Sequence, residues 1–398
     1  MKLDGDVALG HLTYCTNIHA GETWPEVLSA LQRYLPEIKS GFAPQAPMGV
    51  GLRLSAAAAE ALQKPAARAE LHDLLDGAAC YVFTINGFPY GAFHGQKVKE
   101  GAYRPDWSDP ARLHYSNALA RLLASLLPDG IDGSVSTVPG TYKPWANGGA
   151  IDAIVENLLQ HAAELVTLER DTGKTIALAL EPEPCCLLET IAETVAFFQQ
   201  RLYSSQSVAR LAKLTGFDSN AAEQALRRHL GVCYDVCHAA VEFENARESI
   251  AGLRAAGIPV AKLQLSCALK VANVTPAAVD ELRAFDEPVY LHQVVEKPAD
   301  GRLRRYTDLG EAIANAHTAG GAEWRIHFHV PIFERELKRF ATTQEFLREI
   351  LALHHQAPIS EHLEVETYTW DVLPERHRRI GMGAAIAREL NWVKDQLC

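Results

Sequence analysis

The chain has 398 residues, of which 48% are hydrophobic and 22% are charged, and its formal net charge is −11. This is the composition of an ordinary globular protein rather than a disordered chain. The negative charge, without any run of Lys and Arg, argues against nucleic acid as a partner. The opening residues carry acids where a signal peptide needs bases, and no apolar run approaches the ~20 residues that span a bilayer. We therefore expect no membrane span and a cytoplasmic location.

Short apolar runs alternate with longer amphipathic stretches from one end of the chain to the other. We predict strands within residues 7–15, 48–54, 80–86, 133–139, 176–184, 230–238, 261–267 and 363–369. Helices are expected over Pro25–Ile38, Ala56–Leu75, Pro110–Leu127, Ile151–Leu168, Leu188–Leu202, Arg247–Ala256, Thr343–Leu353 and Met382–Val393. Repeated β/α units with continuous apolar strands are typical of a parallel sheet covered on both faces. The sequence predicts a single α/β domain over residues 1–398, a (β/α)₈ (TIM) barrel.

Two stretches exceed the needs of a minimal barrel. Residues 203–229 predict a helical insertion after the fifth strand, of one or two helices. Residues 270–335 contain two further strand-like runs, VYLHQVVEK and WRIHFHVPIF. Because both runs alternate at period two, the segment Val289–Phe333 predicts a β-hairpin insertion after strand seven, folded over the C-terminal mouth of the barrel. Insertions at that end usually serve the site.

Polar residues end four of the later strands. Glu181 ends the fifth, Asp235 the sixth with His238 three residues on, Gln264 lies in the seventh, and Glu366 ends the eighth. Each acid alone reads more simply as a helix cap or a partner of a lysine. Together at one barrel mouth they predict a divalent cation, because clustered carboxylates need one. Mn²⁺, Mg²⁺, Zn²⁺ and Co²⁺ all suit such donors.

The runs LALEPEP, YDVCH and LEVET resemble the metal-site pattern of the xylose-isomerase-like superfamily of sugar phosphate isomerases and epimerases. The resemblance implies Glu181, Asp235 and Glu366 as metal ligands, and His238 as a contact to substrate or to a further metal. The family's strand-seven histidine falls on Gln264, whose amide oxygen could ligate in its place. His329, which shares a strand face with His327, is the other candidate. A pair of histidines on a solvated hairpin face is the competing interpretation.

At finer resolution the chain resembles EboE-type metabolite traffic proteins, through LTYCTNIHAGETW, NGFPYGAFHGQKVKEGAYRPDW, HFHVPIF and LEVETYTWDVLP. Such proteins are encoded with clusters thought to move or finish secondary metabolites. The aromatic loop after strand three suits a substrate pocket as well as simple packing. Residues expected to bind substrate are His19, Asn86, His94, His238, His292 and His327.

Three functions fit these residues. The first is a metal-dependent isomerase or epimerase of a small polyhydroxylated or carbonyl metabolite, with Glu181, Glu366 and His238 as catalytic groups. The second is a metal-containing metabolite carrier without turnover, which the loss of the strand-seven histidine favours. A third, an abasic-site endonuclease, needs more histidine ligands and a basic groove. An oligomer is compatible with all three.

Overall fold

The computed structural model describes the chain except for residues 4–7, 92–97, 338 and 370–380. Its centre is a sheet of eight parallel strands in the order β1-β14-β7-β6-β5-β4-β3-β2. A parallel bridge between Cys15 and Gly51 joins the two edge strands. The strands are β1 His11–Tyr14, β2 Met48–Arg53, β3 Cys80–Asn86, β4 Gly133–Thr137, β5 Ile176–Leu180, β6 Leu230–Asp235, β7 Val260–Leu265 and β14 His362–Val365. The predicted (β/α)₈ barrel is confirmed.

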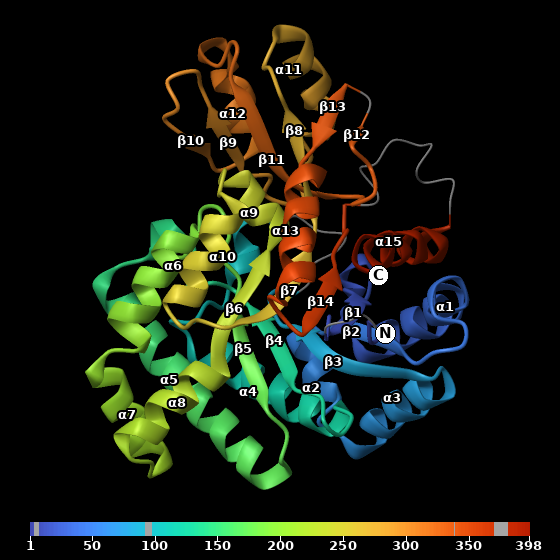
Figure 1. Ribbon diagram of the computed structural model, residues 1–398, viewed down its shortest axis with the longest axis vertical. Coiled ribbons are helices and arrows are strands. Elements are labelled where there is room, and N and C mark those ends of the chain that lie inside the picture. Colours follow the sequence, from blue (N-terminus) through green and yellow to red (C-terminus); the bar gives the residue numbers. More distant parts are fainter. Residues whose placement is uncertain (4–7, 92–97, 338, 370–380) are drawn as a thin grey trace.

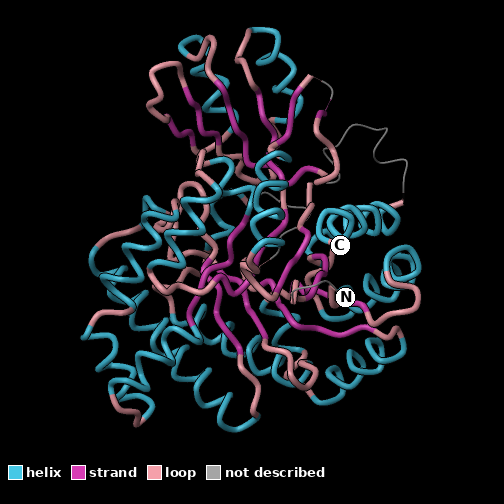
Figure 2. Tube along the Cα trace, in the orientation of Figure 1, coloured by secondary structure: helices cyan, strands magenta, loops and turns pink. Residues whose placement is uncertain are grey.

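Helices cover the outside of the barrel (Figures 1 and 2). They are α1 Trp24–Phe42, α2 Ala56–Ala61, α3 Pro65–Gly77, α4 Pro110–Leu126, α5 Gly148–Thr172, α6 Ile191–Phe197, α7 Ser205–Thr215, α8 Ser219–His229, α9 Val236–Val241, α10 Ala246–Ala255, α13 Gln344–Gln356 and α15 Met382–Leu397. The single helix expected over Ala56–Leu75 is divided into α2 and α3. Pro65 has no N–H to continue the first helix, and it occupies the first position of the second. Residues 203–229 contain α7 and α8, separated at Gly216, which has a φ of 77°.

The barrel interior is polar below the mouth. Lys262 on β7 and Glu364 on β14 form a fully buried ion pair at 2.5 Å. A Cβ built on Gly51 would lie 1.7 Å from Glu364 Oε2, so only glycine leaves room for this carboxylate. Glu364 lies two residues before Glu366, which directly follows β14. The ion pair therefore lies in the barrel interior beneath the strand ends.

A second, antiparallel sheet of six strands stands on the C-terminal side of the barrel, at the top of Figure 1. Its strands are β8 Cys267–Val271, β9 Val294–Lys297, β10 Arg304–Tyr306, β11 Glu323–Val330, β12 Glu336–Leu337 and β13 Phe340–Thr342, with α11 Pro276–Leu282 and α12 Leu309–Asn315 beside them. Only Ser266 separates β7 from β8, so the chain passes directly from the barrel into this sheet.

The insertion is therefore larger than the expected hairpin. β9 and β11 do pair antiparallel, as the two apolar runs predict, but β11 also pairs with β8 and β9 pairs with β10. The sequence pattern missed β8 because its apolar run continues that of β7 without a turn. β12 and β13 are too short for a period of two to show. Among the described residues, no helix is both long and apolar enough to cross a membrane.

Candidate metal centre

Three carboxylates meet at the C-terminal ends of the barrel strands, and we call them the carboxylate cluster. Glu181 directly follows β5, Asp235 ends β6, and Glu366 directly follows β14. Each offers an oxygen within 4.8 Å of the other two, and all three side chains are at most 4% exposed. The structure thus brings together the acids that the sequence predicts to share a site.

The hydrogen bonds of the carboxylate cluster are incomplete. Asp235 Oδ1 accepts from the Ser266 hydroxyl at 2.7 Å and from the backbone N–H of His238 at 3.0 Å. Asp235 Oδ2 and Glu181 Oε2 are buried and accept no hydrogen bond from any described residue. A buried carboxylate oxygen without a donor costs several kcal/mol, roughly, unless a cation compensates it. Two such oxygens in one buried cluster of carboxylates therefore fit a divalent metal.

Glu366 is held in place from both sides. Its Oε1 accepts from the side-chain amides of Asn17 at 2.6 Å and Asn86 at 3.1 Å. Its Oε2 lies 3.2 Å from His329 Nδ1. These contacts fix the carboxylate without using all of its lone pairs, as is common for metal ligands.

The charges of the cluster shift its pKa values in opposite directions. Burial, and then the neighbouring Glu366 and Asp235, raise the pKa of Glu181 well above its ordinary value. Burial would also raise the pKa of Glu366, but the hydrogen bond and charge of His329 outweigh it and lower the pKa. Burial works to lower the pKa of His329, yet its contacts with Cys237 and Asp235 raise it well above the usual range.

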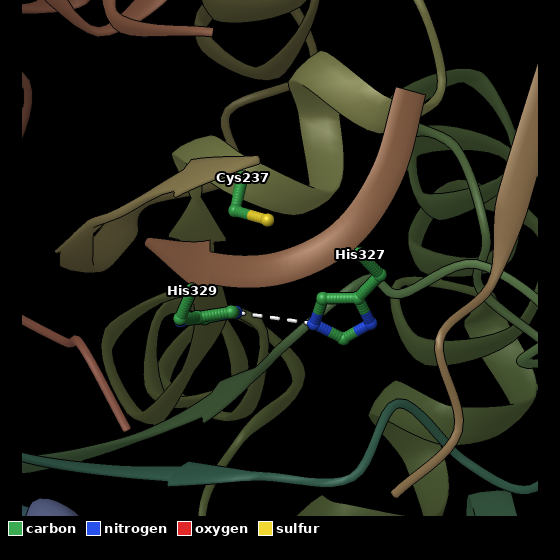
Figure 3. A group of neighbouring side chains, drawn as sticks. All are labelled: Cys237, His327 and His329. Carbon is green, nitrogen blue, oxygen red and sulfur yellow. Dashed lines mark hydrogen bonds between the residues drawn. The ribbon is translucent and has the colours of Figure 1, made fainter. Parts of the chain in front are cut away.

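Three imidazoles form a histidine cluster over the carboxylates: His238 on α9, and His327 and His329 on β11. His327 Nε2 lies 3.1 Å from His238 Nε2 and 3.1 Å from His329 Nε2. His329 Nε2 also lies 3.9 Å from Asp235 Oδ2. Figure 3 shows the contact between the Nε2 atoms of His327 and His329, with Cys237 nearby. Burial raises the pKa of the Cys237 thiol to about 11.

Other predicted site residues lie elsewhere. Gln264 is paired in register with both Asp235 and Glu364, but its amide oxygen lies 3.9 Å from Cys233 Sγ and the residue does not line the cavity. Both ring nitrogens of His292 are engaged, by the carbonyl of His327 at 2.9 Å and by Glu287 at 2.9 Å. His292 therefore supports β11 rather than facing the cavity.

Two expected substrate contacts flank the first and third strands. His19 stacks on the Tyr34 ring at 4.3 Å and contacts the Tyr14 hydroxyl at 3.1 Å, away from the residues that line the cavity. Asn86 does line the cavity. His94 lies outside the described residues.

The cavity above the two clusters has further walls, of which the sequence indicated only the aromatic loop after strand three. Tyr103 and Gln293 both donate to Glu183 Oε1, at 2.8 and 3.1 Å. The Tyr368 ring lies over His329 with centroids 4.6 Å apart. Phe88, Pro89, Val98, Tyr290 and Leu291 complete an apolar wall. For Glu183 the available signal was its spacing two residues after Glu181, because alternate residues of an extended segment share a face.

The sequence matches no protein-family model and no curated protein. Solved structures similar to the chain include the probable 3-DHS dehydratase AsbF from Bacillus anthracis, with 13% identity over 96% of this chain and 97% of that one and a TM-score of 0.45. A D-tagatose 3-epimerase-like protein has 12% identity over 97% and 98%, with a TM-score of 0.46. The IolI protein with a binding zinc atom has 13% identity over 97% and 98%, with a TM-score of 0.44. These likenesses are too distant to carry chemistry to this chain, and the EboE-type resemblance stays a prediction.

Proposed function

We propose that the protein is a metal-dependent isomerase or epimerase of a small polyhydroxylated or carbonyl metabolite. The observation that carries the proposal is the carboxylate cluster, with two buried oxygens that accept no hydrogen bond from the part of the chain that the structure describes. Glu181, Asp235 and Glu366 would hold a divalent ion, and His329 would complete the set. We choose His329 over Gln264 because His329 contacts both Asp235 and Glu366, whereas the Gln264 amide oxygen lies 3.9 Å from Cys233 Sγ and Gln264 does not line the cavity.

The metal, when bound, would polarise a substrate carbonyl or hydroxyl oxygen. The remaining chemistry belongs to the side chains. Glu181 lines the same cavity, so the carboxylate oxygen that does not ligate the ion would suit the role of base. Asn17, Asn86 and His329 fix the Glu366 carboxylate, so Glu366 is better placed to ligate the metal ion than to transfer a proton. His238 would orient a second substrate oxygen.

Two features of the cavity support a small, partly apolar substrate. Tyr290, Leu291 and Phe88 give the cavity an apolar wall beside the charged groups Glu181, Glu183 and Glu366. The only described lysine lining the cavity, Lys99, is paired with Asp308 at 2.5 Å, so it is not set aside for a phosphate group.

The carrier alternative rested on the missing strand-seven histidine. His329, brought in by β11, lies beside Asp235 and Glu366, so an imidazole is available and this argument loses its force. A carrier would still need the metal but not a base.

Proton exchange separates the two functions. The protein, loaded with Mn²⁺ or Co²⁺, is incubated in D₂O with a panel of ketoses and hydroxyketones, and NMR follows deuterium incorporation beside the carbonyl. An isomerase or epimerase exchanges this hydrogen with at least one compound, and Glu181→Gln abolishes the exchange. Tight binding of a compound without exchange in any member of the panel would instead identify a carrier.

A further inference from the structure

The cavity beside the carboxylate cluster holds more negative charge than a divalent ion would offset. Glu183 adds a fourth carboxylate to the three of the cluster, and it is only 6% exposed. A divalent ion compensates two of these four charges. Lys99 is the only basic side chain among the described lining residues that is not a histidine, and Asp308 neutralises it at 2.5 Å. A buried surplus of negative charge favours a ligand that brings a positive charge of its own.

Glu183 is held on one side and open on the other. Its Oε1 accepts from the Tyr103 hydroxyl at 2.8 Å and from Gln293 Nε2 at 3.1 Å. Its Oε2 accepts no hydrogen bond from any described residue, although the side chain is buried and lines the cavity. The protein therefore fixes the direction of this carboxylate and leaves one oxygen for a donor from a ligand.

The imidazoles beside Glu183 also present acceptors. His238 Nδ1 faces the carbonyl oxygen of Pro182 at 3.0 Å, which can only accept, so this Nδ1 carries the hydrogen. Gln293 donates through its Nε2, so its oxygen is the atom 2.6 Å from His327 Nδ1, which carries a hydrogen as well. The Nε2 atoms of these two neutral rings lie 3.1 Å apart with their lone pairs facing one another. A donor that reaches both rings would relieve this contact.

An ammonium group matches these three acceptors better than a hydroxyl group does. It has three N–H donors and no acceptor, whereas a hydroxyl has a single donor. Glu183, His238 and His327 each offer an atom within 4.8 Å of the other two. Three atoms so close can all be reached from one point at about 2.8 Å, the length of an ordinary hydrogen bond from nitrogen.

Aromatic rings line much of the remaining cavity surface. Phe88 and Tyr103 form one edge-to-face pair with centroids 6.0 Å apart, and Tyr290 and Tyr368 form another at 5.6 Å. The faces of such rings attract ammonium groups. The aromatic wall therefore suits a cationic ligand as well as an apolar one.

We propose that the substrate carries a primary ammonium group, held by Glu183, His238 and His327 beside the oxygen that the metal would polarise. The proposal rests on the proposed function, because it assumes that the carboxylate cluster holds the metal. His238 Nε2 lies 4.0 Å from Asp235 Oδ2, so the two positions are neighbours. The ammonium nitrogen takes the place of the second substrate oxygen, which makes the substrate an amino sugar or another aminated polyol.

Paired ligands test the proposal. Calorimetry on the full chain loaded with Co²⁺ compares 1-amino-1-deoxyfructose with fructose, and glucosamine with glucose and N-acetylglucosamine. In at least one pair the amine should bind about 10-fold tighter or more than its hydroxyl counterpart, as expected for a hydrogen bond between charged groups. N-acetylglucosamine, which has lost the charge, should show no such gain.

A variant and a matched control locate the amine. Glu183→Gln should remove most of the preference for the amine. Glu296→Gln replaces a buried carboxylate on β9 that binds Arg304 and Trp324 outside the cavity, and it should keep the preference. Glu183→Gln retains an oxygen to accept from Tyr103. If circular dichroism shows that this variant is misfolded, His327→Gln takes its place with the same expected loss.

The outcomes separate this proposal from the proposed function. Equal affinities within both pairs, or no binding by either amine, overturn it. A preference that survives in the folded variant also overturns it, because the amine would then bind the metal directly. Deuterium exchange into a neutral ketose without any preference for amines leaves the isomerase standing and refutes the ammonium site. A preference for amines without exchange in any compound refutes the isomerase instead.

Discussion

Replacing Glu181 by glutamine should have opposite effects on stability with and without metal. Its carboxylate lies within 4.8 Å of ligand oxygens of Asp235 and Glu366, all buried. At an effective dielectric constant of about 20, two unit charges at this separation repel by about 3 kcal/mol. Proton uptake by Glu181, whose pKa burial raises, relieves part of this repulsion. We therefore expect Glu181→Gln to stabilise the metal-free protein by about 1 to 2 kcal/mol.

With metal bound, the wild type should be more stable than Glu181→Gln. An ion at 100 times its dissociation constant stabilises the folded wild type by about 2.7 kcal/mol, and the variant, lacking one ligand, should gain far less. Urea unfolding at pH 7.5 in EDTA, and again in excess Mn²⁺ or Co²⁺, measures both differences. Glu60→Gln, at an exposed position on α2, is the control and should behave as wild type in both buffers. An equal metal-induced gain in wild type and Glu181→Gln would refute the role of this carboxylate.

Three further perturbations probe the site and its support. Burial raises the pKa of Glu389 to about 7, above its value of about 4.5 in the unfolded chain, so the folded state holds the proton more tightly. The free energy of unfolding should therefore fall as pH rises from about 4.5 to 7, by up to ~1.4 kcal/mol per pH unit. Glu389→Gln should flatten this slope in urea titrations, and an unchanged slope would contradict the raised pKa. His329→Ala should weaken metal binding, measured by calorimetry, roughly 10- to 100-fold or more. A metal affinity within error of the wild type would remove His329 from the site. Gly51→Ala places a Cβ 1.7 Å from Glu364 and should destabilise the barrel by at least about 1 to 3 kcal/mol, whereas Gly252→Ala on α10, where a Cβ meets nothing, should not; equal thermal midpoints would argue against the crowding.

The barrel could be predicted because short buried strands, several of them continuous apolar runs such as IALAL, alternate with longer amphipathic helices. The same local signal located Glu181, Asp235 and Glu366, since residues that end parallel strands meet at one mouth. The β11 strand was visible as the alternating run WRIHFHVPIF, which is why His329 could be suggested as a partner of this mouth.

The contacts between segments that lie far apart in the sequence could not be predicted. Tyr103 and Gln293 are 190 positions apart and converge on Glu183 only because the antiparallel sheet folds back over the barrel. Gln264 lies in register with both Asp235 and Glu364, and only the structure shows that its amide oxygen lies near the Cys233 thiol and that the residue does not line the cavity. β8 was hidden because nothing in the sequence marks Ser266 as the point where one sheet becomes the other.

Anomalous diffraction from crystals soaked in Mn²⁺ or Co²⁺ tests the central claim most directly. We predict a peak at about 2.0 to 2.6 Å from oxygens of Glu181, Asp235 and Glu366. A saturating soak with no anomalous peak among these three carboxylates, or with the peak bound elsewhere on the chain, would contradict the metal centre and the function proposed from it.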